Sequence, residues 1–239
     1  MQPLLLLATG AAIGCLGTLL GLGGGFILVP ILLYAFRFPQ PIAVGTSHVV
    51  ICLNAVSGAI AYDRQRKIDY DLALCLAVPA IPASAFASAF IVPRFQSPWF
   101  LVAFAGILVF GAVYVMQRGK LADLGSEREP SVRARWVCAG LSLVSGVAAA
   151  TLGVGGGVFY VPMLAILLGR PFHRATATSV FVLLLSSLVA AAVLVWRGQV
   201  DVTFALWLGL GVIAGAQAGA RLATRLNNAT LRAVFAGAV

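Results

Sequence analysis

Long apolar stretches separated by short polar segments dominate the chain. Residues 99–116 and 139–168 contain no charged residue, and each reaches or exceeds the roughly 18 residues that indicate a membrane-spanning helix. Four such segments are expected in each half, at 4–36, 42–62, 72–92 and 99–116, then at 136–168, 175–196, 204–222 and from 231 onward. The pattern predicts an all-α, polytopic membrane protein with eight hydrophobic segments.

The sequence repeats itself at an offset of 132 positions. The motif GxGGG at 21–25 recurs at 153–157, and other pairs keep the same register: Val29 and Val161, Pro30 and Pro162, Thr46 and Thr178, Ser47 and Ser179, Asp69 and Asp201. Such a repeat indicates a tandem duplication. We expect membrane repeats at 1–117 and 136–239, joined by the polar linker 118–135, and by the same offset the last helix should continue beyond residue 239.

The first segment of each half is too long for one straight helix. About 33 residues would extend about 50 Å, whereas the hydrocarbon core is roughly 30 Å thick. We expect the helix to break at its glycine cluster. The break could leave either a tilted, interrupted span or a hairpin that returns to the same side of the membrane.

The positions of Lys and Arg favour the hairpin. Eight plain spans would divide fifteen of the 16 basic residues nine to six between the two sides. With two hairpins, Arg37, Arg94 and Arg197 lie on one side and twelve basic residues on the other, as the positive-inside rule expects. Three full crossings per half then make the halves an inverted repeat, which is common in secondary transporters.

Composition narrows the class of protein further. The chain is 61% hydrophobic and 10% charged, against roughly 25% charged residues in soluble domains, which excludes a water-soluble fold. Its net charge of +9 is spread in small groups between apolar blocks, which is typical of cytoplasmic loops and not of a nucleic-acid-binding face. The four cysteines show no CxxC spacing, so neither a zinc site nor a disulfide framework is indicated. We expect no metal site and no cofactor. The N-terminus lacks the basic region of a signal peptide, and we interpret it as part of the mature fold.

The duplicated glycine clusters are the strongest candidate site. Bare backbone in a membrane is tolerated only where it is buried in protein or lines a watery cavity. The amides that begin the next helical limb, near 25–26 and 157–158, would carry the positive end of a helix dipole and suit an anion. The alternative to an anion site is that the glycines allow close packing of helices. Nucleotide binding is excluded because Phe26 stands where the GxGxxG motif requires glycine. The candidate binding residues are Gly23, Gly24, Gly25, Gly155, Gly156 and Gly157.

Neutral polar residues follow each cluster on the next helix. Seven residues after each serine of the Thr-Ser pairs, on the same helical face, stand Asn54 and Ser186. These groups could donate hydrogen bonds to anion oxygens, although hydroxyls in membrane helices often bond to their own backbone or to a neighbouring helix. The candidates are Thr46, Ser47, Asn54, Thr178, Ser179 and Ser186. His48, whose counterpart is Val180, is a candidate proton carrier or substrate contact, or a neutral histidine bonded between helices.

Two further residue sets have structural interpretations. Asp69 and Asp201 precede the third helix of each half and should cap its N-terminus. The stripe formed by Gly211, Gly215 and Gly219 is interpreted as a packing face, and Gln217 beside it could reach a cavity.

Together, the duplicated GxGGG and Val-Pro motifs, each followed by a Thr-Ser pair, resemble the TauE/SafE family of sulfite-exporter-like membrane proteins over essentially the whole chain. The resemblance implies a non-enzymatic transporter that moves sulfur-containing anions, such as sulfite or organosulfonates, across the bacterial inner membrane. We expect alternating access, with the linker in the cytoplasm, and an anion-selective channel is the alternative. Coupling could use His48, a sodium ion or the membrane potential. The expected partners are a small anion and the lipid bilayer, with a homodimer left open.

Overall fold

The computed structural model describes residues 2–94 and 130–227, together with 102, 105, 106, 109, 230, 231, 233 and 234. Every regular element in these ranges is a helix, and six of the helices are long and apolar enough to cross a membrane. The predicted all-α, polytopic membrane architecture is therefore confirmed. The fourth predicted segment, 99–116, and the last one, from 231, lie largely outside the described residues.

The described helices occur in the same order in both halves. The first half contains α1 (Gln2–Leu20), α2 (Gly25–Pro30), η1 (Ile31–Ala35), α3 (Gln40–Arg64), α4 (Tyr70–Phe86) and η2 (Ala87–Ile91). The second contains α6 (Val132–Leu152), α7 (Gly157–Pro162), η3 (Met163–Leu167), α8 (Phe172–Trp196) and α9 (Val202–Ala223). The bounds of α2, η1 and α3 recur in α7, η3 and α8 at the offset of 132 positions that relates the two halves of the sequence.

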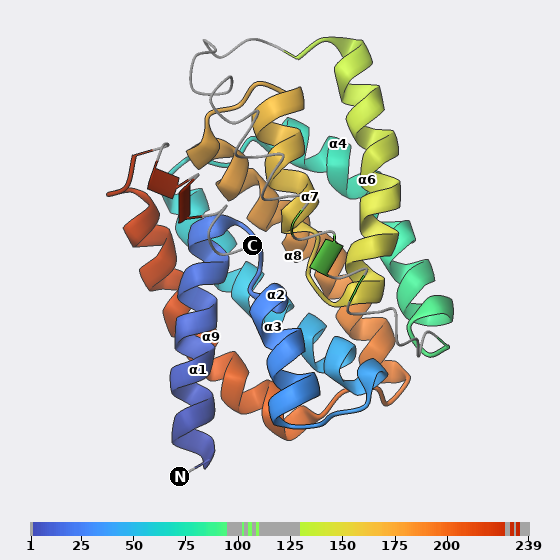
Figure 1. The fold of residues 1–239 in the computed structure, drawn as a ribbon. Coiled ribbons are helices and arrows are strands. Elements are labelled where there is room, and N and C mark those ends of the chain that lie inside the picture. The colour runs from blue at the N-terminus through green and yellow to red at the C-terminus, as the bar shows by residue number, and fades with distance from the viewer. Residues whose placement is uncertain are drawn as a thin grey trace.

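The path of the chain is visible in Figure 1. α1 runs upward from the N-terminus, and α2 with η1 returns to the lower side, where α3 begins. α3 then runs upward and α4 downward. In the second half every direction is reversed: α6 descends, α7 returns upward, α8 descends and α9 rises.

Local sequence explains where several of these helices begin and change form. Asp69 and Asp201 cap α4 and α9 by accepting hydrogen bonds from the amides of Leu72 (3.3 Å) and Phe204 (3.0 Å), which confirms the predicted caps. Pro30 and Pro162 lack an amide proton, and immediately after each the helix widens into the π-helical η1 or η3.

The two halves are interleaved. α1 packs along α9, α6 packs along α4, and α3 packs against α8 in the centre of the molecule. Side chains at Gly211, Gly215 and Gly219 of α9 would collide with the backbone of α1. The interpretation of this stripe as a packing face is therefore confirmed.

Candidate functional site

A break interrupts the first segment of each half at the glycine cluster. α1 ends at Leu20 and α2 begins at Gly25, and likewise α6 ends at Leu152 and α7 begins at Gly157. Backbone φ is positive at Gly21 (73°), Gly23 (78°) and Gly24 (84°), and at their counterparts Gly153 (72°), Gly155 (85°) and Gly156 (74°). Residues with a Cβ rarely adopt this conformation, so the glycines permit the chain to leave one helix and enter the next.

The last glycine of each cluster brings the two breaks together. A Cβ on Gly25 would collide with the carbonyl oxygen of Gly153, and a Cβ on Gly157 would collide with that of Gly21. The breaks of the two halves are therefore in direct contact through their backbones, and only glycine fits at Gly25 and Gly157 without displacing the opposite half.

Serine hydroxyls tie each break to the opposite half. Ser47 Oγ of α3 donates to the carbonyl of Gly153 at 2.8 Å, and Ser179 Oγ of α8 donates to the carbonyl of Gly21 at 2.9 Å. Each serine thus satisfies a carbonyl that the broken helix leaves without its usual partner. In this conformation the hydroxyl protons of both serines are committed to the protein.

The threonines of the two Thr-Ser pairs are acceptors for the opposite half. Thr46 Oγ1 accepts from the amide of Asp201 at 3.0 Å, and Thr178 Oγ1 accepts from the amide of Asp69 at 3.1 Å. All four hydroxyl residues are buried. The four hydrogen bonds form two equivalent pairs, as expected if a two-fold axis relates the halves.

Two apolar side chains lie at the junction of the breaks. The Cβ positions of Gly23 and Gly155 would both contact Ile51 of α3 and Leu183 of α8. Ile51 and Leu183 are themselves separated by the repeat offset and are fully buried. Residues 21–26 and 153–158 are buried throughout, so the junction is closed to solvent in this conformation.

The amides that begin α2 and α7 have no backbone acceptor among the described residues. No hydrogen bond between described residues outside the helices is donated by the amides of Gly25, Phe26, Gly157 or Val158. These four residues are the first two of α2 and the first two of α7. The backbone N–H groups at the start of a helix have no acceptor within that helix. The amides that the sequence singled out are thus buried and available as hydrogen-bond donors.

The remaining candidates have different surroundings. His48 is buried, and its Nδ1 lies 3.0 Å from the carbonyl oxygen of Val44, one turn earlier. Asn54 Oδ1 accepts from Thr18 Oγ1 at 3.0 Å, whereas Asn54 Nδ2 has no hydrogen-bond partner within the described ranges. Ser186 Oγ donates to the carbonyl of Val182 at 3.0 Å.

Sequence reasoning missed two buried polar groups near the breaks. Thr18 lies three residues before the first break and bonds to Asn54, and Tyr160 lies four residues after Gly156 with its hydroxyl fully buried. Neither residue has a polar counterpart at the repeat offset, so a search for repeated motifs does not detect them. Gln217 Nε2 donates to the backbone oxygen of Ser57 at 2.8 Å.

Different contacts join the corresponding helix ends on the two sides of the molecule. At the upper side of Figure 1, Arg170 and Asp69 form a 2.8 Å ion pair between the loops that precede α8 and α4. At the lower side, the counterpart of Arg170 is Phe38, which packs with its ring centroid 4.9 Å from that of Phe204. Phe36 lies 4.8 Å from the same ring.

Beside the ion pair, Lys67 belongs to the same loop as Asp69. Partial burial lowers the pKa of the Lys67 ammonium from its ordinary value. The upper end of the molecule thus combines several basic side chains with one closely paired carboxylate.

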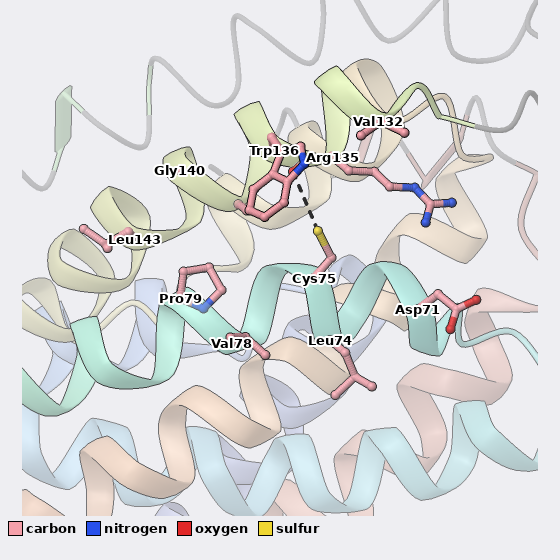
Figure 2. A pocket seen from close by; sticks show the side chains of 11 residues that line it. Asp71, Leu74, Cys75, Val78, Pro79, Val132, Arg135, Trp136, Gly140 and Leu143 are labelled. Atoms are coloured by element: carbon pink, nitrogen blue, oxygen red, sulfur yellow. Dashed lines mark hydrogen bonds between the residues drawn. The ribbon is translucent and has the colours of Figure 1, made fainter.

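An apolar groove lies apart from the breaks. It has a volume of about 820 Å³ and is lined by residues of α4 and α6, with Asp71 and Arg135 at one end and Leu143 toward the other (Figure 2). The Cys75 thiol donates to the Arg135 carbonyl across it at 3.6 Å. None of the sequence-predicted site residues lines this groove. Within the described ranges, no three His, Cys, Asp or Glu side chains are grouped so that they could hold a metal ion.

Comparison with known proteins identifies the family. The profile of the family described as "Sulfite exporter TauE/SafE" matches residues 6–239. The probable membrane transporter protein YunE of Bacillus subtilis (strain 168) is 27% identical, over 97% of this chain and 92% of its own. A probable membrane transporter protein of Methanocaldococcus jannaschii is 27% identical, over 95% of this chain and 89% of its own. One of Xylella fastidiosa (strain 9a5c) is 28% identical, over 92% and 85% respectively.

No solved structure is significantly similar to the chain. The family match covers nearly all of the sequence, including both glycine clusters, and these relatives carry the same general description. The chain therefore belongs to the TauE/SafE family and is a membrane transporter.

Proposed function

We propose that this protein is a secondary transporter that moves small sulfur-containing anions, such as sulfite or organosulfonates, across the bacterial inner membrane. The observation that carries the proposal is the contact between two glycine breaks, one from each half, where buried backbone amides have no backbone acceptor among the described residues. Amides at helix N-termini favour negative charge. The description of the family as a sulfite exporter supports the choice of anion.

The proposed arrangement of the halves is an inverted repeat with a hairpin at the start of each. The reversed directions of corresponding helices support it, as do the two equivalent pairs of hydrogen bonds between the halves. In such folds the substrate site lies near the bilayer midplane, at the interface of the repeats. The junction of the glycine breaks is the corresponding position here.

The basic residues support a cytoplasmic position for the linker. Within the described ranges, only Arg37, Arg94 and Arg197 stand at helix ends on the lower side of Figure 1, where the N-terminus lies. The other described basic residues stand at helix ends on the upper side: Arg64, Arg66, Lys67, Arg133, Arg135, Arg170, Arg174, Arg221 and Arg225. By the positive-inside rule the upper side faces the cytoplasm. The predicted linker, 118–135, lies mostly outside the described residues.

In the proposed mechanism the present conformation is occluded. Ile51 and Leu183 lie where the two breaks meet, so an anion can bind only after α3 and α8 shift relative to each other. Such a shift would also release the hydroxyls of Ser47 and Ser179 from the opposite break. The freed hydroxyls and the unpaired amides would then surround the anion with neutral donors, which can hold it without trapping it.

Alternating access requires that the two ends of the molecule open in turn. The Asp69–Arg170 ion pair holds the end that we assign to the cytoplasm, and the aromatic cluster of Phe36, Phe38 and Phe204 holds the other end. Because one closure is polar and the other apolar, the two open states differ in free energy, which favours one resting orientation.

Uptake of labelled sulfite, organosulfonates and thiosulfate into proteoliposomes tests the proposal. We expect saturable uptake and counterflow by the wild type, loss of uptake in Gly24→Ala and Gly156→Ala, and normal uptake in Gly140→Ala, because Gly140 has open space around it. Variants are compared only if they elute as folded, monodisperse protein. Uptake equal to that of empty liposomes for every anion would overturn the proposal, and linear flux without counterflow would identify an anion-selective channel instead.

A further inference from the structure

Tyr160 places an unpaired hydroxyl at the second glycine break. The side chain is fully buried, and its Oη has no hydrogen-bond partner within the described part of the chain. Its ring lies over the break, since a Cβ on Gly156 would come within 2.7 Å of Tyr160 Cε2. A buried polar group without a partner is unfavourable and uncommon in native proteins, so its presence calls for a physical reason.

Two serine hydroxyls, those of Ser142 and Ser186, lie beside the phenol. Ser142 donates its proton to the carbonyl of Leu76 and Ser186 donates its proton to the carbonyl of Val182, so neither serine can donate to Tyr160 Oη. The phenol's own proton meets no acceptor with ordinary hydrogen-bond distance and angle among the described residues. Tyr160 is therefore left as a donor in a small polar environment formed by α6, α7 and α8.

This environment exists in only one half of the repeat. At the offset of 132 positions, Tyr160 corresponds to Leu28 and Ser142 corresponds to Gly10. The first break consequently has no phenol at the equivalent position, and the phenol close to it, Tyr62, is paired with the carbonyl of Thr18. Among the described residues, Asn54 Nδ2 is a side-chain donor without a partner in that half. The duplication has kept the backbone of both breaks but has added a hydroxyl donor to the second.

We infer that the Tyr160 hydroxyl binds an oxygen atom of the transported anion at the second break. This inference rests on the proposed function and names a specificity-determining residue within it. A phenol donates one directed hydrogen bond, and such a bond is stronger to an anionic oxygen than to a neutral one. Because Tyr160 is uncharged, it contributes to recognition of an oxyanion without opposing its release.

Tyr160→Phe tests the inference, because it removes only the hydroxyl. We expect the KM for the best labelled anion in proteoliposomes to rise about 10-fold or more, since a hydrogen bond to a charged group is lost. The melting temperature in detergent should stay the same or rise, since an unpaired buried hydroxyl is removed. Tyr62→Phe is the matched control: the Tyr62 hydroxyl is buried and donates to the Thr18 carbonyl at 2.9 Å, so this variant should lose stability and keep its KM.

The possible results separate this inference from the proposed function. If the wild type transports an anion and Tyr160→Phe has the same KM, the inference is overturned and the proposed function stands. If the wild type transports none of the anions, both the inference and the proposed function are overturned.

Binding is also measured without reconstitution, as the rise in melting temperature that sulfite causes in detergent. A smaller rise in Tyr160→Phe than in the wild type supports the inference, and an equal rise overturns it.

Discussion

Glycine has two distinct physical roles at each break. Gly153, Gly155 and Gly156 adopt positive φ, which a Cβ would make unfavourable by about 1–2 kcal/mol per residue. Gly157 has an ordinary helical conformation but lies against the carbonyl of Gly21 in the other half. Glycine at this position allows the backbones of the two halves to come into contact, and a side chain there would push the halves apart.

Gly157→Ala should therefore destabilise the protein, although alanine is the better helix former. A collision with buried backbone that cannot move freely is expected to cost about 1–3 kcal/mol or more. Gly140→Ala is the control, because Gly140 lies in the middle of α6 with nothing near its Cβ position, and it should gain about 0.5–1 kcal/mol. Thermal unfolding in detergent measures both, and equal melting temperatures for the two variants would contradict the close-packed junction.

The repeat explains which site residues could be predicted from the sequence. The glycine clusters and the Thr-Ser pairs stand out because each occurs twice, and the structure brings them together at one junction. Sequence reasoning gave Ser47 and Ser179 the role of substrate donors, but it could not show that their protons are used by the opposite break. Tyr160 was missed because a single tyrosine in an apolar segment resembles an ordinary core residue.

At the scale of helices, the predicted segments agree closely with the structure. The apolar segment at 42–62 became α3 (Gln40–Arg64) and that at 204–222 became α9 (Val202–Ala223), because long apolar runs and Asp or Pro at the helix start are local signals. Which helices pack together could not be predicted. The pairing of α1 with α9, and of α4 with α6, joins segments from different halves and depends on contacts that periodicity does not report.

The caps of α4 and α9 allow a matched test of the ion pair. Asp69→Asn keeps an N-cap, since asparagine caps as well as aspartate, but removes the charge that pairs with Arg170. We expect it to lower the free energy of unfolding by about 1–3 kcal/mol, because the pair is largely buried. Asp201→Asn changes the equivalent cap, which has no ion pair among the described residues, and should alter stability by no more than about 0.5 kcal/mol.

Urea unfolding in a mild detergent measures the two variants side by side. A loss of stability in Asp69→Asn alone would support the ion pair as the contact that holds this end of the molecule closed. Equal effects of the two substitutions would mean that the cap, and not the ion pair, dominates.

At the scale of the whole molecule, the proposed transport mechanism depends on the opposite directions of the two halves. Only that arrangement relates the breaks by a two-fold axis, gives each serine the same role toward the opposite half, and collects most basic residues on one side. It also yields two related but unequal ends, one closed by an ion pair and one by aromatic rings. In the proposed mechanism, the two ends open in turn as one half moves relative to the other.

The sidedness of three positions tests this arrangement most directly. In a variant without the four native cysteines, single cysteines at Gln2, Arg37 and Lys120 are labelled in intact cells with a membrane-impermeant maleimide. The hairpin arrangement predicts that Gln2→Cys and Arg37→Cys are labelled from outside, whereas Lys120→Cys reacts only after the cells are permeabilised. Labelling of Gln2→Cys and Arg37→Cys from opposite sides, or of Gln2→Cys and Lys120→Cys from the same side, would contradict the account.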